Sequence, residues 1–244
     1  VMMGNSVEML ECLFGVVRAG GCVVPLSGLL TADQLESLLR DCDAVAAFVS
    51  DDFQDRTGPL HANLPEIKTW IAHGFDAEGW GSVAGIFATS PDSMPDVRHA
   101  LTDPFNIIYS SGTTGLPKGI VQTHRARLHW AFSNAVEMGF GSDSRALTTT
   151  PLYSNGTWLM MLPVLFAGGT LHVMPAFDAG DFLAKVAEER ITHTFMVPAQ
   201  YLMVLERPEL DDADLSRLLK VLSAGSPLRR DTKRQIIERI SPGL

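Results

Sequence analysis

Short apolar runs alternate with longer amphipathic segments along most of this chain, and this alternation limits the folds open to it. One apolar run, 44–49, follows a helical pattern that starts at Thr31 and Gln34, and another, 192–197, follows a helical pattern over 178–190. Apolar runs of this length between helices are typical of parallel strands in sheets whose two faces are covered. The sequence therefore predicts an α/β fold with mostly parallel sheets covered by helices.

The same patterns predict the remaining elements. Asn5 with Glu8 is close to a capping box at the start of the first helix, and Pro198 suits the first turn of a helix. Residues 51–104 contain five prolines and are expected to form a loop-rich connection. Further strands are expected over 22–26, 67–71, 105–109, 146–150, 170–174 and 220–222, and further helices over 124–138 and 229–240.

Glycine and serine at 139, 141 and 142 interrupt the chain after the helix expected over 124–138. We predict a boundary between two α/β subdomains there, with the first covering 1–140 and the second 141–244. Arg125 and Arg127, at the start of the same helix, are expected to be solvated, with attraction of ATP as the alternative. The chain begins at Val1, almost directly in a helix, and we expect this start to be a cut inside a longer protein.

Composition excludes several classes of function. A net charge of −9 gives no basic field for nucleic acid. The odd count of three cysteines, with no CxxC pair, favours neither a disulfide framework nor a zinc site and fits a reducing, cytoplasmic location. The seven histidines lack metal-ligand spacing, so no metal site is expected within these residues. The longest apolar run, 158–167, is too short to cross a bilayer.

The stretch YSSGTTGLPKGIVQTH at 109–124 places glycines, hydroxyls and one lysine directly after an apolar run. Glycines let several backbone N–H groups approach one ligand, and hydroxyls and Lys118 add donors, so a polyphosphate is the expected ligand. A flexible surface loop is the simpler alternative. The P-loop pattern fails at two of four defining positions, because Pro117 replaces a glycine and Gly119 replaces the Ser/Thr.

YSSGTTGLPKG resembles the phosphate-binding signature of the adenylate-forming (AMP-binding) superfamily, which includes acyl- and aryl-CoA synthetases, luciferases and the adenylation domains of peptide synthetases. TTTPLYSNGTW, ITHTFMVPAQYLMVL and VLSAGSPL resemble three further stretches of that family, in the same order and spacing. The resemblance covers essentially the whole chain. It implies part of the large N-terminal domain of an AMP-forming acid–thiol ligase such as an acyl-CoA synthetase.

In that family a carboxylate attacks the α-phosphate of ATP, pyrophosphate leaves, and a thiol such as that of coenzyme A takes the acyl group from the adenylate. By resemblance, the ATP phosphates would be bound by Ser110, Ser111, Gly112, Thr113, Thr114, Gly115 and Lys118. The adenine ring would lie along Gly225, Ser226 and Pro227, although an ordinary turn remains open there. The acyl pocket would be lined by Tyr153, Ser154, Gly156, Met160, Pro198 and Tyr201, or these could be core residues.

Two departures from the family bear on the substrate. Many CoA ligases carry a histidine where this chain has Ser154, which puts a gating role there in doubt. PLYSNGTW lacks the aspartate by which peptide-synthetase domains hold an amino group, so an amino acid is disfavoured. Small Gly156 and flexible Met160 are expected to leave an apolar cavity for a fatty or aryl acid. A fatty acid substrate would imply a role in fatty acid metabolism.

Other features of the family do not occur in these residues: the acid that holds Mg²⁺, the ribose-binding aspartate, the hinge and the catalytic lysine of the C-terminal domain. We therefore expect no catalytic residue in this chain and no complete reaction by residues 1–244 alone. Two alternatives stay open, a non-catalytic nucleotide-binding module and an adenylation domain that loads a carrier protein. The sequence leaves the acceptor thiol and the oligomeric state open.

Overall fold

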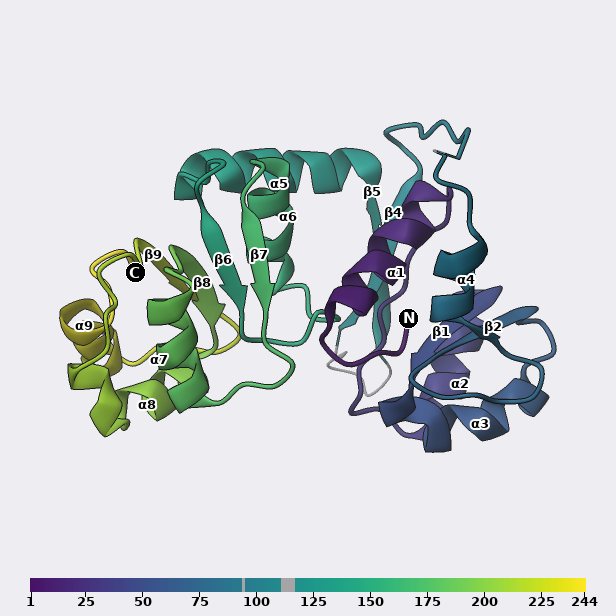
Figure 1. The fold of residues 1–244 in the computed structure, drawn as a ribbon, viewed down its shortest axis with the longest axis horizontal. Helices are drawn as coiled ribbons and strands as arrows, with labels where there is room; N and C mark the ends of the chain where they lie inside the picture. The colour runs from purple at the N-terminus through teal and green to yellow at the C-terminus, as the bar shows by residue number, and fades with distance from the viewer. Residues whose placement is uncertain (94, 111–116) are drawn as a thin grey trace. The chain divides into compact units, whose positions relative to one another are not determined.

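The computed structural model describes residues 1–93, 95–110 and 117–244, and it divides the chain into two compact units, 1–125 and 126–244 (Figure 1). Both units contain helices and a parallel sheet, so the predicted α/β class is confirmed. The division lies before the predicted boundary near residue 140, because helix α5 (His124–Met138) contributes buried side chains to the second unit. Over the described ranges, every helix falls short of the length and apolar character that crossing a membrane requires.

The first unit holds a three-stranded parallel sheet in the order β1-β2-β3. Its core contains Leu35 and Leu38 from α2, Val49 from β1 and Trp70 from β2, all of which are buried. The elements are α1 (Val7–Arg18), α2 (Ala32–Asp41), β1 (Ala46–Ser50), the 3-10 turn η1 (Asp51–Phe53), α3 (Gln54–Asn63), β2 (Thr69–His73), β3 (Gly81–Ser82) and α4 (Val83–Thr89).

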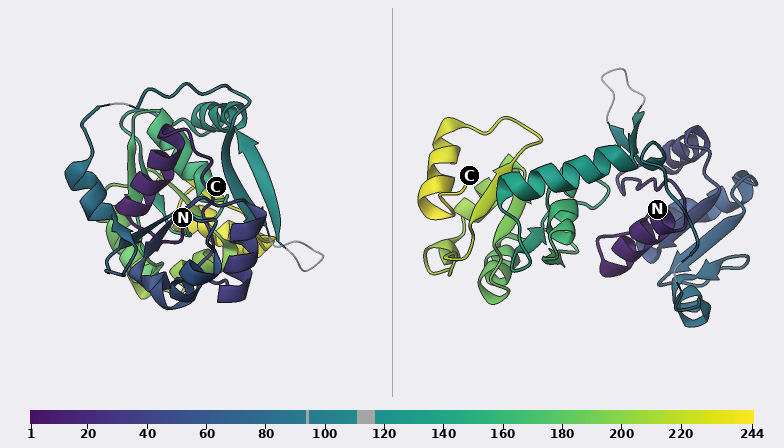
Figure 2. Two further views of the ribbon diagram at one scale, coloured as in Figure 1. Left: turned by 90° about the vertical axis from the view of Figure 1, so that its right-hand side faces the viewer. Right: turned by 90° about the horizontal axis from the view of Figure 1, so that it is seen from above.

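Two longer strands of the first unit, β4 (Pro104–Ser110) and β5 (Lys118–Thr123), pair antiparallel and run side by side in every view (Figures 1 and 2). Sequence reasoning treated Lys118 and Gly119 as loop residues and missed β5. The glycine-rich stretch thus connects two antiparallel strands. A P-loop leads from a strand into a helix, so this connection agrees with the rejection of that motif.

The strand predicted over 22–26 is wrong. Val23 forms only an isolated parallel bridge to Asn106, in which its N–H donates to Phe105 O and its carbonyl accepts from Ile107 N. Pro25 has no N–H to donate, so the ladder cannot continue through it.

The loop-rich connection predicted for 51–104 is also wrong in part, because α3, β3 and α4 lie within it, whereas β2 overlaps the strand predicted over 67–71. Gly58 and Pro59 suggest a turn, yet both lie inside α3. The helix forms because its Leu60 side chain is buried in the core of the first unit, where tertiary packing outweighs local propensity.

The two predicted helix starts had different outcomes. At α2 the predicted start at Thr31 and Gln34 is confirmed and forms a capping box, since the Thr31 side chain accepts from Gln34 N and the Gln34 side chain accepts from Thr31 N. At α1 the cap is Ser6 instead of Asn5, and its hydroxyl accepts from Met9 N at 3.0 Å.

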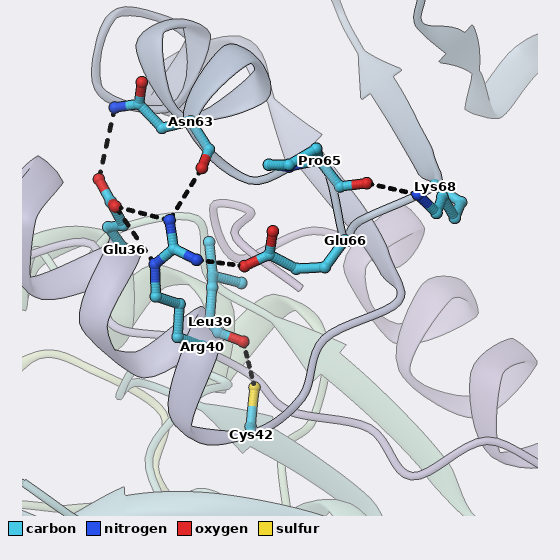
Figure 3. A network of polar contacts seen from close by, with 8 residues as sticks. All are labelled: Glu36, Leu39, Arg40, Cys42, Asn63, Pro65, Glu66 and Lys68. Atoms are coloured by element: carbon cyan, nitrogen blue, oxygen red, sulfur yellow. Dashed lines mark hydrogen bonds and ion pairs between the residues drawn. The ribbon is translucent and has the colours of Figure 1, made fainter.

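A polar network on the first unit joins α2 to the end of α3 (Figure 3). The Arg40 guanidinium donates to Glu36 Oε1 at 3.0 Å, to Asn63 O at 2.8 Å and to Glu66 Oε1 at 2.5 Å. About half of the Arg40 side chain is exposed, so these ion pairs orient the segments and add little stability.

The second unit holds a four-stranded, fully parallel sheet in the order β7-β6-β8-β9. Pro198 occupies the first turn of α8, as predicted. The elements after α5 are β6 (Arg145–Thr148), α6 (Trp158–Phe166), β7 (Thr170–Val173), α7 (Ala179–Glu188), β8 (His193–Met196), α8 (Pro198–Leu205), the 3-10 turn η2 (Pro208–Asp211), β9 (Lys220–Ser223) and α9 (Arg230–Arg239).

Consecutive residues of these strands face opposite sides of the sheet, and helices cover both sides. Ala146 and Phe195 pack with α6 on one face. Leu147 and Met196 pack with α7, α8 and α9 on the other face. The predicted double cover is therefore confirmed for this sheet, which explains why its strands read as continuous apolar runs.

His193 makes the stability of the second unit depend on pH. Its ring is buried and stacks on the Phe140 ring, with 4.0 Å between the two ring centroids. Its Nδ1 lies 2.7 Å from Thr192 Oγ1, and its Nε2 donates to Met138 O at 3.1 Å. Burial, with a smaller contribution from Lys220, lowers its pKa below the ordinary 6.5, although the Met138 carbonyl and Asp143 act in the opposite sense. The folded state therefore favours the neutral ring.

Since the unfolded chain binds the proton more readily, full stability is expected above about pH 6.5, with a loss as the pH falls toward the lower folded pKa. Denaturant titrations at pH 7.5 and 5.5 measure this loss. His193→Gln should make the unfolding free energy less dependent on pH over this interval, and an unaltered dependence would contradict the assignment. Burial also lowers the pKa of His172, so part of the dependence should remain.

Candidate functional site

The hairpin places the two ends of the predicted phosphate loop next to each other. Ser110 is the last residue of β4, Lys118 is the first of β5, and the two are paired across the ladder with exposed side chains. The other predicted phosphate contacts lie outside the described residues: Ser111, Gly112, Thr113, Thr114 and Gly115.

Tyr109 fastens this hairpin to helix α2. Its hydroxyl donates to Asp41 Oδ2 at 2.5 Å, and burial together with this bond raises the pKa of the phenol. The Tyr109 ring crosses Gly119 on β5, where an added Cβ would lie 3.1 Å from Tyr109 Cε1 and 3.0 Å from Ile107 Cγ2. The glycine after Lys118 therefore leaves space for the tyrosine that anchors the base of the loop.

Tyr109→Phe should lower the free energy of unfolding of the first unit by about 1 kcal/mol, because it removes a charge-assisted hydrogen bond at a partly exposed position. Denaturant titration measures the change. Asp41→Asn keeps an acceptor oxygen for the Tyr109 hydroxyl, so it should lower the free energy of unfolding by less. Equal stability of Tyr109→Phe and the unchanged protein would show that the bond to Asp41 contributes nothing.

Three predicted acyl-pocket residues, Tyr153, Ser154 and Gly156, lie half-buried on the loop over 151–157 that follows β6. The loop is closed at its base, since Thr157 Oγ1 donates to Pro151 O at 2.6 Å. Ser154 N donates to Pro151 O at 2.9 Å. These bonds give the loop a defined shape.

Phe195 of β8 lies directly against Gly156, next to which the sequence predicts an apolar cavity. A Cβ added to Gly156 would lie 2.8 Å from Phe195 Cζ, so the ring rests directly against the glycine. Met160 is completely buried with Phe195 and Val164. A large side chain from the neighbouring strand therefore takes the space directly against the glycine, and the apolar acyl cavity stays a prediction.

Tyr201 and Pro198, on α8, are also buried. The Tyr201 hydroxyl donates to Leu222 O on β9 at 2.8 Å, and burial raises the pKa of this phenol. The ring belongs to the core between the sheet and α7, α8 and α9. These contacts give Tyr201 a structural role, and Pro198 begins α8; the place of both residues in an acyl pocket stays a prediction.

The predicted adenine-side residues, Gly225, Ser226 and Pro227, are exposed on the loop that follows β9. Gly225 has φ of +90°, a conformation that favours glycine, and an added Cβ would lie 3.3 Å from Val197 Cγ1 at the end of β8. The loops after β8 and β9 therefore meet at the carboxyl edge of the sheet, where ligands of α/β proteins bind.

Gln200 joins the ends of β6 and β8 at the same edge. Its Nε2 donates to Thr149 O at 2.7 Å, and its Oε1 accepts from Val197 N at 3.1 Å. Thr149 Oγ1 donates to Phe195 O at 2.7 Å. Sequence reasoning did not single out this buried network. It fixes the strand ends from which the 151–157 loop departs.

Arg127 on α5 is a second residue that sequence reasoning missed, since it was expected to be solvated. Its side chain is buried, and its guanidinium carbon lies 4.4 Å from the ring centroid of Trp158 and 5.3 Å from that of Trp130. Its Nη2 donates to Asn155 Oδ1 at 3.0 Å. The available signal was spacing, because Arg127, Ala131 and Ala135 share one buried face of the helix.

Metal-ligating side chains do not gather within the described residues, where no group of three His, Cys, Asp or Glu could hold an ion. Mg²⁺ in nucleotide sites is bound mainly through substrate phosphates, with one or two carboxylates. A magnesium ion held largely by a bound triphosphate is compatible with this arrangement.

Known proteins resemble this chain in sequence and in structure. The family described as AMP-binding enzyme matches residues 1–242. An indoleacetate–CoA ligase of Aromatoleum aromaticum is 35% identical over 227 residues, which are 92% of this chain and 44% of that protein. A feruloyl-CoA synthase of an Amycolatopsis species is 32% identical over 238 residues, 96% of this chain and 45% of that protein.

Among solved structures, the inhibitor-bound N-terminal domain of FACL13 from Mycobacterium tuberculosis superposes with a TM-score of 0.87 at 24% identity. The match covers 97% of this chain and 58% of that one. The fold is therefore shared, and the chain spans less than half the length of both curated relatives.

Proposed function

Because this chain belongs to the family of AMP-binding enzymes, we propose that it forms part of a ligase that activates a carboxylic acid with ATP as an acyl adenylate and passes the acyl group to coenzyme A. The observation that carries the proposal is the family match over nearly the whole chain, with the glycine-rich stretch closing the β4–β5 hairpin. We also propose that the protein is cytoplasmic, which the three free cysteines support.

The proposed role of the hairpin loop is to bind the β- and γ-phosphates of ATP. The attacking carboxylate and the triphosphate repel each other, so such a reaction needs donors that hold the phosphates and neutralise charge. Ser110 and Lys118 have exposed side chains at the two ends of the loop. Bound Mg²⁺ would neutralise further phosphate charge. The residues proposed with them are Ser111, Gly112, Thr113, Thr114 and Gly115.

For the second unit, we propose that Gly225, Ser226 and Pro227 border the adenine ring and that the 151–157 loop borders the acid. Tyr153, Ser154 and Gly156 lie half-buried on that loop. The names of two relatives refer to indoleacetate and ferulate, which are aromatic acids. An aryl acid is therefore the first substrate class to test, and a fatty acid is the second.

The test is carboxylate-dependent exchange of labelled pyrophosphate into ATP, using the full-length natural protein and a panel of aryl, fatty and amino acids. We expect exchange with one class of aryl or fatty acid, followed by thioester formation when coenzyme A is added. If the acid supports exchange but the thioester forms with a carrier protein and not with coenzyme A, the acceptor is the thiol of a carrier protein. ATP binding with no exchange by any acid would overturn the proposal in favour of a non-catalytic nucleotide-binding module.

A further inference from the structure

A buried arginine connects helix α5 to the loop that carries three of the proposed acid-binding residues. Arg127 is 2% exposed and lies on the helix face that also buries Ala131 and Ala135. Its guanidinium lies over the indole rings of Trp158 and Trp130, at 4.4 Å and 5.3 Å. All of these groups belong to the second unit.

The contacts of Arg127 fall on the last part of the 151–157 loop and on the first residue of α6. Nη2 donates to Asn155 Oδ1 at 3.0 Å. Trp158, stacked on the guanidinium, donates from Nε1 to Leu152 O at 2.9 Å near the beginning of the loop. The arginine therefore contacts the loop directly through Asn155 and indirectly through Trp158, on both sides of Tyr153 and Ser154.

Stability alone is a poor reason for this arrangement. Burial lowers the pKa of Arg127 to about 10, which reflects the cost of removing the cation from water. Neutral apolar side chains of similar volume often replace buried ionic groups with no loss of stability. What an arginine adds is a planar set of donors that stacks on aromatic faces while donating in a fixed direction. That geometry suits the task of holding a loop in one conformation.

We propose that Arg127 is a positioning residue for the carboxylic acid substrate: by holding Asn155 and Trp158, it fixes the 151–157 loop on which Tyr153, Ser154 and Gly156 lie. The proposal rests on the proposed function for the meaning of that loop. Arg127 acts through other residues, so its removal should affect acid binding more than ATP binding.

The first test does not depend on activity. Amide hydrogen exchange is measured over 152–157 in the full-length protein, in Arg127→Met and in the matched control Arg234→Met. Arg234 lies on α9 with a 67% exposed side chain. In Arg127→Met, we expect the amides of Ser154 and Thr157 to exchange faster, on the order of tenfold, with the melting temperature maintained. Exchange at the unchanged rate would overturn the positioning role.

The second test separates the two substrates. In pyrophosphate exchange, Arg127→Met should raise KM for the acid by about tenfold and leave KM for ATP within about twofold. Arg127→Lys keeps the charge but not the planar donors and should show an intermediate increase. The matched control Arg234→Met, which removes an exposed arginine from α9, should leave both KM values unchanged.

Equal increases in both KM values would indicate a general structural defect and overturn the proposal. If the unchanged protein supports exchange with no acid, the proposed function fails on its own, and the amide exchange still decides whether Arg127 holds the loop.

Discussion

Gly169→Ala is expected to destabilise the second unit by about 3 kcal/mol, because the added methyl group has no space and its neighbours cannot move away. A Cβ at this position would lie 2.6 Å from Ser144 O, 3.0 Å from Gly141 O and 2.8 Å from Val164 Cγ2. Two of these atoms are backbone carbonyl oxygens. The Ser144 carbonyl already accepts from Thr170 N at 2.8 Å, where β6 and β7 begin.

The methyl group must therefore either separate the starts of two neighbouring strands or displace the end of α6. Gly168, with φ of +76°, ends that helix, and Gly169 N donates to Val164 O at 2.9 Å. Denaturant titration of the purified variant measures the loss.

The matched control for this substitution is Gly15→Ala. Gly15 is exposed inside α1, and an added Cβ would have nothing within 4 Å. Alanine there should stabilise the helix by about 0.5–1 kcal/mol through the reduced entropy of the unfolded chain. If Gly169→Ala were as stable as the Gly15→Ala control, the close approach of the Ser144 carbonyl would not be a real constraint.

The alternation of strands and helices in the second unit could be predicted because burial on both faces produces continuous apolar runs. The 192–197 run contains β8, and the pattern after Asp178 gives α7 with Asp178 as its cap. Thr31 and Gln34 likewise carry a complete local signal, since both partners of the capping box lie within one helical turn. Local periodicity and caps therefore identify two kinds of element: those stabilised by partners near in sequence, and those whose residues are apolar along their whole length.

Features that depend on distant partners were missed. Strand β5 has four exposed residues in succession, Lys118 to Val121, and it forms because β4 pairs with it. Helix α3 contains Pro59 and is held by a core that local propensity does not describe. Arg127 looks like a surface residue by type. It is buried against partners that are distant in sequence, including Asn155 and Trp158, about 30 residues further along the chain.

The candidate site divides in the same way. The motif predicts a phosphate cradle because glycines let backbone N–H groups converge and hydroxyl groups add donors, and the contact of these residues with a nucleotide stays a prediction. The space around Gly156 could not be predicted, because the size of a cavity depends on which side chain of a neighbouring strand enters it. Here that side chain is Phe195.

Lys118→Ala is expected to weaken the use of ATP by the full-length protein by about 10- to 100-fold. Lys118 begins β5 opposite Ser110, so the ladder fixes its backbone while its side chain remains exposed. A hydrogen bond from a charged donor contributes about 1.5–3 kcal/mol, and each 1.4 kcal/mol corresponds to a factor of ten. The loss should appear in KM for ATP during pyrophosphate exchange.

The fold should tolerate this change, because an exposed lysine at a strand end contributes little to stability. Lys233→Ala, which removes an exposed lysine from α9, is the matched control and should leave KM for ATP unchanged. Lys118→Arg keeps the charge on a bulkier group and should fall between alanine and the unchanged protein. If Lys118→Ala binds ATP as well as the Lys233→Ala control does, the lysine is not a phosphate ligand, and the loop must bind the triphosphate through its backbone and hydroxyl groups alone.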